Sequence, residues 1–155
     1  MIDFTWDAGS MGSGIVEIDR QHQEILRWLE NLMLAIKAGH GPDVLETMLD
    51  YLSLYADLHF ACEEACMDFY ACPAAAVNRA GHARFRARLT GLRERVQREG
   101  GTERVLAEVE QDLVQWLRRH IRFIDTRLRA AVSAAQEPAA SRPAAGGSTA
   151  LPPPC

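Results

Sequence analysis

The sequence predicts an all-α protein, an up-down-up-down antiparallel four-helix bundle with an N-terminal arm and a disordered C-terminal tail. Between residues 15 and 132, apolar residues recur at alternating spacings of three and four, as they do on the buried face of a helix. Turn-forming residues divide this stretch into four segments joined by short connections, and short connections make sequential helices antiparallel neighbours. With 155 residues and 48% hydrophobic content, the chain can bury one core of ordinary size. We therefore expect a single domain.

The chain begins with an arm that contains Phe4 and Trp6 and that we expect to pack across one end of the bundle. The first helix is predicted over about residues 19–38. It ends at the stretch GHGPD, where glycine and proline interrupt the pattern and Asp43 can cap the next helix. That second helix is predicted over about residues 44–70.

The third helix is predicted over about residues 75–99 and the fourth over about residues 103–131. Gly100 and Gly101 separate them, and Thr102 is the expected N-cap of the fourth helix. The bundle domain is expected to span residues 1–132.

Residues 133–155 are predicted to be a disordered tail. They are rich in Ala, Pro, Gly and Ser, and they contain too little bulky apolar surface to offset the entropy that the chain would lose on folding.

Charge and hydropathy exclude several classes of partner. The formal net charge of -4 argues against nucleic acid as a partner, and the arginines between Arg79 and Arg98 are interpreted as a solvated helix face. No segment approaches the roughly 18 consecutive apolar residues that a membrane span needs. The N-terminus shows no secretory signal, so we expect a cytoplasmic protein with reduced cysteines.

Each predicted helix carries one histidine on its apolar stripe, and the stripe of the second helix also carries a glutamate. These residues are His22, His59, Glu63, His82 and His120. A single such histidine is most simply a core residue satisfied by a hydrogen bond. Five buried polar groups without a common partner would each cost about 1 to 3 kcal/mol, which is most of a domain's net stability. A shared metal ion would remove this cost.

The alternating helix directions bring the four histidines toward the same end of the bundle. Imidazoles mixed with carboxylates suit iron, manganese or zinc rather than calcium. Asp125 lies five residues after His120, about 140° around an ideal helix, so spacing alone leaves open whether it is a ligand or a surface aspartate.

Four segments in this order resemble the bacterial hemerythrins over roughly residues 4–130: IDRQH (18–22), HFACEE (59–64), HARF (82–85) and WLRRHIRFID (116–125). The resemblance implies a four-helix bundle around a non-haem di-iron centre that binds O2 reversibly. It also implies the roles of the ligands. One iron, with an open position for O2, would be held by His22 and His59, the other by His82 and His120, and the two irons would be bridged by Glu63 and Asp125.

The sequence departs from the family pattern at one ligand, because the His-x-x-x-His of the third helix reads Asn78-x-x-x-His82. An amide oxygen is a weaker donor to a transition metal than an imidazole. We therefore expect two iron ions, with reduced occupancy or replacement by another metal on the side of Asn78.

Three functions follow from the resemblance. The first is dioxygen binding for carriage, storage or delivery. The second is a di-iron oxidoreductase acting on peroxide, nitric oxide or a small organic substrate, for which Asn78 leaves room, and the third is an oxygen or redox sensor. The ligand pattern favours a binding protein over an enzyme.

Residues near the predicted ligands have simpler interpretations. Glu24 and Glu64 are interpreted as surface carboxylates rather than as groups that orient the ligand imidazoles. Cys62 and Cys66 are interpreted as small buried hydrophobes rather than redox groups. His40 matches no ligand position.

Overall fold

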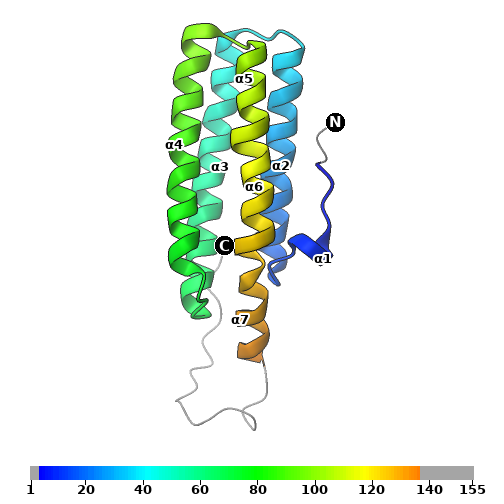
Figure 1. Ribbon diagram of the computed structural model, residues 1–155, viewed down its shortest axis with the longest axis vertical. Helices are drawn as coiled ribbons and strands as arrows, with labels where there is room; N and C mark the ends of the chain where they lie inside the picture. Colours follow the sequence, from blue (N-terminus) through cyan, green and yellow to red (C-terminus); the bar gives the residue numbers. More distant parts are fainter. Residues whose placement is uncertain (1–3, 137–155) are drawn as a thin grey trace.

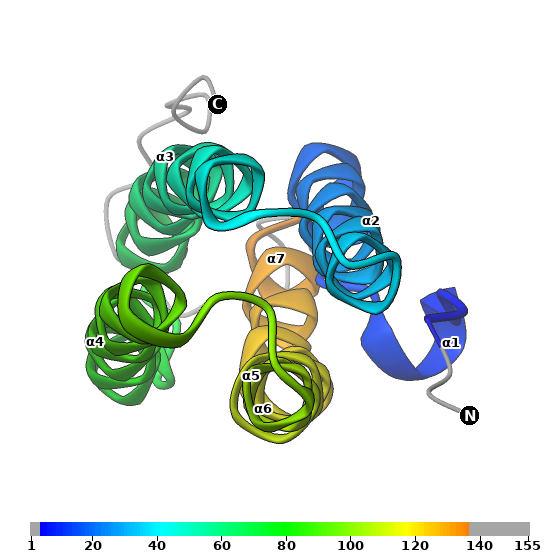
Figure 2. The same ribbon diagram turned by 90° about the horizontal axis from the view of Figure 1, so that it is seen from above.

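The computed structural model describes residues 4–136 (Figure 1). Within this range the chain is helical and contains no strand, which confirms the predicted all-α class. Seen from above, the long helices occupy the four corners of a bundle (Figure 2). The elements are α1 (Ala8–Met11), α2 (Val16–Lys37), α3 (Pro42–Phe69), α4 (Ala75–Glu99), α5 (Glu103–Glu108), η1 (Val109–Val114), α6 (Gln115–His120), η2 (Ile121–Asp125) and α7 (Arg127–Gln136).

The three long helices α2, α3 and α4 match the predicted segments, with differences at two starts. Helix α2 begins at Val16 rather than near Asp19, which lies in its first turn and accepts the Ser13 backbone N–H at 2.7 Å. Helix α3 begins at Pro42 rather than after it, so Asp43 lies in its first turn and the prediction that it caps this helix is wrong. Proline is tolerated in a first turn, where its missing N–H would have no partner within the helix. Helix α4 has the predicted bounds.

The fourth long helix is a single rod of five consecutive elements, α5 to α7 (Figure 1). Two of them, η1 and η2, are π-helical turns, which the sequence pattern did not predict. Helix α7 continues past the predicted end near Ala131 to Gln136. Of the predicted tail, residues 137–155 lie outside the described residues.

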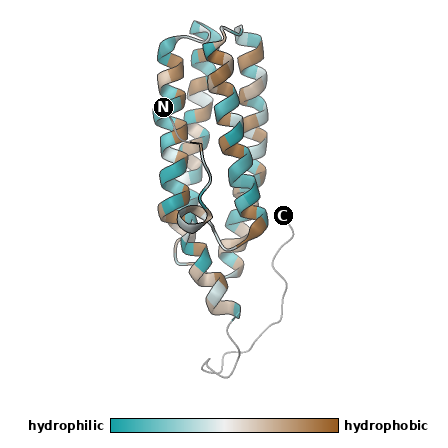
Figure 3. Ribbon diagram, turned by 90° about the vertical axis from the view of Figure 1, so that its right-hand side faces the viewer, coloured by the Kyte–Doolittle hydropathy of each residue, from teal (hydrophilic) through white to brown (hydrophobic). Residues whose placement is uncertain are grey.

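The N-terminal arm lies along the side of the bundle beside α2, and not across one end as predicted (Figure 3). Phe4 and Trp6 pack against the main hydrophobic core, so their ring surface is buried against the flank of the helices. The short α1 is held to α7 by Arg129, whose guanidinium donates to the backbone carbonyls of Gly12 and Gly9.

The core consists of two apolar clusters. The order of residues along the helices places a layer of polar residues between the two clusters. Along α3, Phe60 belongs to the larger cluster and Met67 to the smaller one, with Glu63 between them. Along the fourth rod, Ile121 belongs to the larger cluster and Leu128 to the smaller one, with Asp125 between them. None of the helices described between residues 4 and 136 combines the length and apolar content that a membrane span requires.

Candidate metal centre

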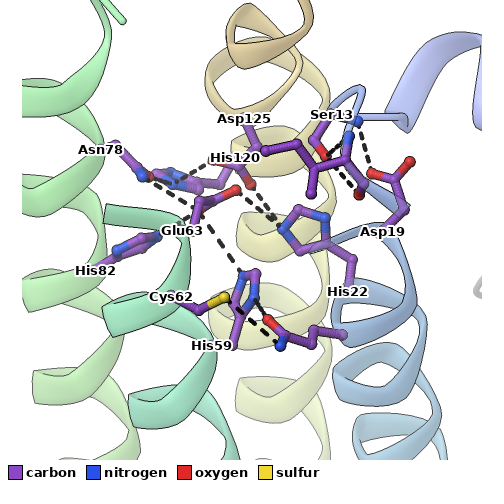
Figure 4. Close-up of polar contacts among 12 residues, drawn as sticks. Ser13, Asp19, His22, His59, Cys62, Glu63, Asn78, His82, His120 and Asp125 are labelled. Carbon is purple, nitrogen blue, oxygen red and sulfur yellow. Dashed lines mark hydrogen bonds and ion pairs between the residues drawn. The ribbon is translucent and has the colours of Figure 1, made fainter. Parts of the chain in front are cut away.

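Seven polar side chains from all four long helices meet in this layer, which we call the polar layer (Figure 4). They include all six predicted site residues, and the most exposed of them, His120, has a relative accessibility of only 7%. The members are His22 of α2, His59 and Glu63 of α3, Asn78 and His82 of α4, His120 of α6 and Asp125 of η2. The convergence predicted from the histidine positions is therefore present in the structure.

Glu63 connects imidazoles of different helices. Its Oε1 lies 3.5 Å from His22 Nε2, and its Oε2 lies 3.2 Å from His82 Nε2 and 3.9 Å from His59 Nε2. The Nε2 atoms of these three rings therefore surround one carboxylate.

Asp125 likewise connects imidazoles of two different helices, on the side of the fourth rod. Its Oδ2 lies 3.2 Å from His22 Nε2, and its Oδ1 lies 3.1 Å from His120 Nε2. The two carboxylates thus share His22 as a common neighbour.

Six buried atoms of the polar layer lack a hydrogen-bond partner within the described part of the chain: both ring nitrogens of His22, His82 Nε2, Glu63 Oε1 and both oxygens of Asp125. Left unsatisfied, each would cost about 1 to 3 kcal/mol. The residues form two groups whose ligand atoms lie within 4.8 Å of one another, His22 with His59 and Glu63, and His82 with His120 and Asp125. Donor type, burial and spacing all fit a transition-metal pair.

The π-helical turn η2 explains how Asp125 reaches the polar layer. In this turn the Thr126 backbone N–H bonds to the Ile121 carbonyl at 3.1 Å, an i→i+5 bond. Such a bond brings residues five apart onto one side of the helix. Asp125 and His120 therefore both point inward, and the angle of about 140° expected of an ideal helix does not apply.

The buried charges perturb the acidities of three members. Burial lowers the pKa of His22, but the adjacent Asp125 carboxylate and the charge of Glu63 outweigh it, so the pKa is raised overall. Burial, followed by repulsion from His22, holds the pKa of His59 well below its usual range. Burial raises the pKa of Asp125, but the contacts with His120 and His22 outweigh it and lower the pKa strongly. Asp125 is therefore ionised and His59 neutral, as a metal ligand must be.

Two residues outside the polar layer orient its imidazoles. His59 Nδ1 lies 3.0 Å from Gln21 Oε1, and His82 Nδ1 lies 2.8 Å from Glu64 Oε1. In both rings, Nδ1 donates outward and Nε2 is left to face the centre. The interpretation of Glu64 as a surface carboxylate that orients no ligand is therefore wrong, because this partly buried acid on α3 contacts the His82 ring on α4.

Gln21 was missed in the sequence, although one signal was available. It lies three residues after Ile18 and four before Ile25, which are both fully buried, so it shares their face of α2. Its Nε2 contacts Cys62 Sγ at 3.9 Å and Glu17 Oε1 at 3.2 Å, which fixes the amide with its oxygen toward His59. Glu24, by contrast, pairs with Arg27 at the surface, as predicted.

Asn78 occupies the position of the missing histidine and is fully buried. Its Nδ2 donates to Glu63 Oε2 at 3.2 Å, and its Oδ1 accepts from His120 Nε2 at 2.6 Å. Gly81, one turn later, lies against the same imidazole, because a Cβ added there would collide with the His120 ring. Asn78 is thus hydrogen-bonded to two of the predicted ligands.

The prediction that the cysteines are reduced can be compared with the structure at three residues. Cys66 and Cys72 are buried thiols outside any disulfide, whereas Cys62 is disulfide-bonded, so the prediction is wrong for that residue. Burial, together with the charge of Glu63, raises the pKa of the Cys66 thiol. A raised pKa makes a thiol unreactive, in agreement with its interpretation as a small hydrophobe. Cys155 lies outside the described residues.

Comparisons with known proteins agree with the chemistry of the polar layer. The family model described as the hemerythrin HHE cation binding domain matches residues 13–132. A protein named bacteriohemerythrin, from Stenotrophomonas maltophilia (strain R551-3), is 33% identical over 112 residues, which cover 72% of this chain and 71% of that protein. No solved structure gives a significant match. The range matched by the family model contains every member of the polar layer.

Proposed function

Because the chain belongs to the hemerythrin family of cation-binding domains, we propose that it is a non-haem di-iron protein that binds dioxygen for carriage, storage or delivery. The observation that carries the proposal is the polar layer, in which the Nε2 atoms of four histidines lie within 4 Å of two carboxylates. A pair of ferrous ions held there would supply reversible binding of O2. The chain's own residues would supply the ligands, their orientation and the exclusion of water.

The contacts support a division of the ligands between two ions. His22 and His59 would hold the ion that keeps a position open for O2, and His82 and His120 would hold the other. Glu63 and Asp125 would bridge the two ions, since each lies between imidazoles from different helices. This arrangement leaves the first site with both of its protein imidazoles.

The second site is proposed to bind its metal more weakly because of Asn78. Its Oδ1 lies 2.6 Å from His120 Nε2 and so accepts that nitrogen's proton. A metal ion that takes His120 as a ligand must displace the proton and break this bond. Reduced iron occupancy, or replacement by another metal, is the expected result on this side.

Aromatic rings pack on two imidazoles of the polar layer and shield them from solvent. Phe60 stacks on His82 with ring centroids 3.8 Å apart, and Trp116 stacks on His120 at 4.6 Å. Ile25 and Leu117 are buried close to the ligands in sequence. A site shielded in this way slows the entry of protons, and a bound O2 would then leave unreduced.

The test is anaerobic reconstitution with ferrous iron followed by exposure to air. We expect a visible charge-transfer band that appears with O2 and bleaches when O2 is removed, together with a measured number of irons per chain. His59→Leu removes a ligand of the O2-facing ion and should abolish the band. A folded, iron-loaded protein with no O2-dependent band would contradict the proposal.

Asn78 favours one alternative, a di-iron oxidoreductase acting on peroxide, nitric oxide or a small organic substrate. A second site with fewer strong ligands leaves room for a substrate to approach it. The same preparation distinguishes the two functions. One-way oxidation with turnover of added peroxide would favour the enzyme, and a band that cycles with O2 would favour the binding protein.

A further inference from the structure

Helix α3 is apolar on two sides, and only one of them faces the core. Its buried stripe includes Leu45, Leu49 and Leu52. On its outer side it carries large hydrophobic residues that are strongly exposed: Tyr51 is 58% accessible, Leu54 69% and Leu58 58%. A helix that is hydrophobic all round is normally buried on all sides. Within the described part of the chain, no further helix covers this outer side of α3 between its neighbours α2 and α4.

These outer residues follow a seven-residue repeat. Steps of three and four along α3 give a line of exposed residues that we call the outer seam: Val44, Thr47, Tyr51, Leu54, Leu58, Ala61 and Ala65. Apolar residues repeating every 3.5 positions over three heptads are the pattern of a helix that packs against another helix. The pattern thus indicates that the partner of the outer seam is another helix.

One flank of the outer seam is a ladder of ion pairs with the same repeat. Three arginines of α4, seven residues apart, pair with acids of α3: Arg93 with Asp50 at 2.8 Å, Arg86 with Asp57 at 2.6 Å, and Arg79 with Asp68. Positive and negative charges therefore alternate beside the seam, and neither sign is in excess along the ladder.

The other flank is aromatic. Trp28 of α2 stacks on Tyr51 with ring centroids 5.9 Å apart and planes 7° from parallel. This contact holds the Tyr51 ring in place beside the outer seam, so less side-chain entropy is lost when a partner packs there.

We propose that the outer seam is a dimer interface, in which α3 of a second copy of this chain packs against it antiparallel about a two-fold axis. A two-fold contact joins the same surface on both copies, so that surface must complement itself. The seam meets this condition. It has three residues on either side of Leu54, so antiparallel packing about that residue sets Leu54 against its mate, Tyr51 against Leu58, and Val44 and Thr47 against the alanines Ala65 and Ala61.

Charge supports the same occupant. The balanced ladder meets an identical ladder without a net repulsion between like charges, whereas unpaired acids on α3 would repel their symmetry mates. The seam from Val44 to Ala65 is about 32 Å long at 1.5 Å per residue, and one helix is about 10 to 12 Å across. The roughly 800 Å² per partner of a stable interface therefore requires that the flanks on α2 and α4 join the contact. His59 and Glu63 lie on the buried side of α3, so the dimer leaves the polar layer intact.

The test measures the mass in solution of the full chain by light scattering and sedimentation velocity, at several concentrations up to the high micromolar range. We expect a species of twice 17.2 kDa. Leu54→Glu places a charge in the contact of both copies, and we expect it to raise the dimer dissociation constant at least about 100-fold. The matched control is Leu34→Glu, because Leu34 of α2 is 57% exposed but lies off the seam. It should remain dimeric.

Circular dichroism melting of both variants excludes unfolding as the cause, and Tyr51→Ser is the milder substitute if Leu54→Glu does not fold. A wild-type chain that stays monomeric at every concentration overturns the proposal, whether the seam then binds lipid vesicles or is covered by residues 137–155. Equal dissociation of the Leu34→Glu and Leu54→Glu variants overturns it as well.

Discussion

The side-chain oxygen of Asn78 lies 2.6 Å from Nε2 of His120, inside the core and between α4 and the fourth rod. That nitrogen is also the one that faces Asp125, at 3.1 Å. Asn78 thus competes for the atom with which His120 would bind a metal, and it holds the imidazole in place while it does so. The substitution of histidine by asparagine has two effects, one ligand fewer and one hydrogen bond more.

Asn78→His is therefore expected to raise the iron content of the reconstituted protein toward two per chain and to slow the loss of the second iron to a chelator. The new imidazole adds a strong donor and removes the acceptor that holds the His120 proton. Iron per chain after desalting is the measurement. Asn78→Ala, which removes the hydrogen bond without adding a ligand, separates the two effects. Unchanged iron content in Asn78→His would contradict this account of the second site.

Gln21→Ala should weaken metal binding about 10- to 100-fold, the usual effect of removing a group that orients a ligand. The variant leaves His59 Nδ1 without the amide oxygen that now lies 3.0 Å away, so the ring can turn and its Nε2 no longer faces the centre. The matched control is Gln23→Ala, because the Gln23 amide donates to the Asp19 backbone carbonyl and, among residues 4–136, to no member of the polar layer. Titration with a chelator of known affinity measures the effect. Equal losses in the two variants would show that Gln21 does not position His59.

Alkylation of Cys66 is expected to be slow in the folded protein, and its rate should still be rising with pH above 9.0, where the rate of an ordinary thiol levels off, because burial, with Glu63, raises the pKa of this thiol. The raised pKa also determines how the contribution of Cys66 to stability changes with pH. The unfolded thiol ionises first, so the contribution of Cys66 to stability is complete below pH 9.0 and falls as the pH rises further. Peptide-resolved mass spectrometry after timed alkylation gives the rate. Fast labelling of Cys66 at neutral pH would revive a redox role for this residue.

The helices could be predicted because each carries a strong 3.6-residue pattern and ends at residues that break it. The bounds of α4 match for this reason, since Pro73 precedes the helix and Gly100 follows it. The π-helical turns could not be predicted, because periodicity analysis assumes one helical period throughout. For the same reason, spacing alone left Asp125 undecided, whereas η2 turns it inward.

The polar layer could be predicted in part because a histidine on an apolar stripe is conspicuous. Residues that act on the histidines from outside were harder to find. Glu64 is a partly exposed carboxylate whose partner, His82, lies on the next helix, and only the packing of α3 against α4 brings the two together. The hydrogen bonds of Asn78 to Glu63 and His120 depend on three helices at once, and no spacing within one helix encodes them.

Gly81→Ala is expected to lower both the melting temperature and the metal affinity of the second site. Glycine inside a helix lowers folding stability by roughly 0.5 to 1 kcal/mol relative to alanine, so helix propensity alone would favour alanine at position 81. A Cβ at this position would collide with the His120 ring, which would have to leave its contacts with Asn78 and Asp125. The control is Gly91→Ala in the same helix, where an added Cβ would meet no described residue within 4 Å. That variant should gain up to about 1 kcal/mol of stability from helix propensity alone. Thermal melts of both variants, with and without iron, measure the difference. If Gly81→Ala stabilised the protein as much as Gly91→Ala did, the space left by Gly81 would have no role in positioning His120.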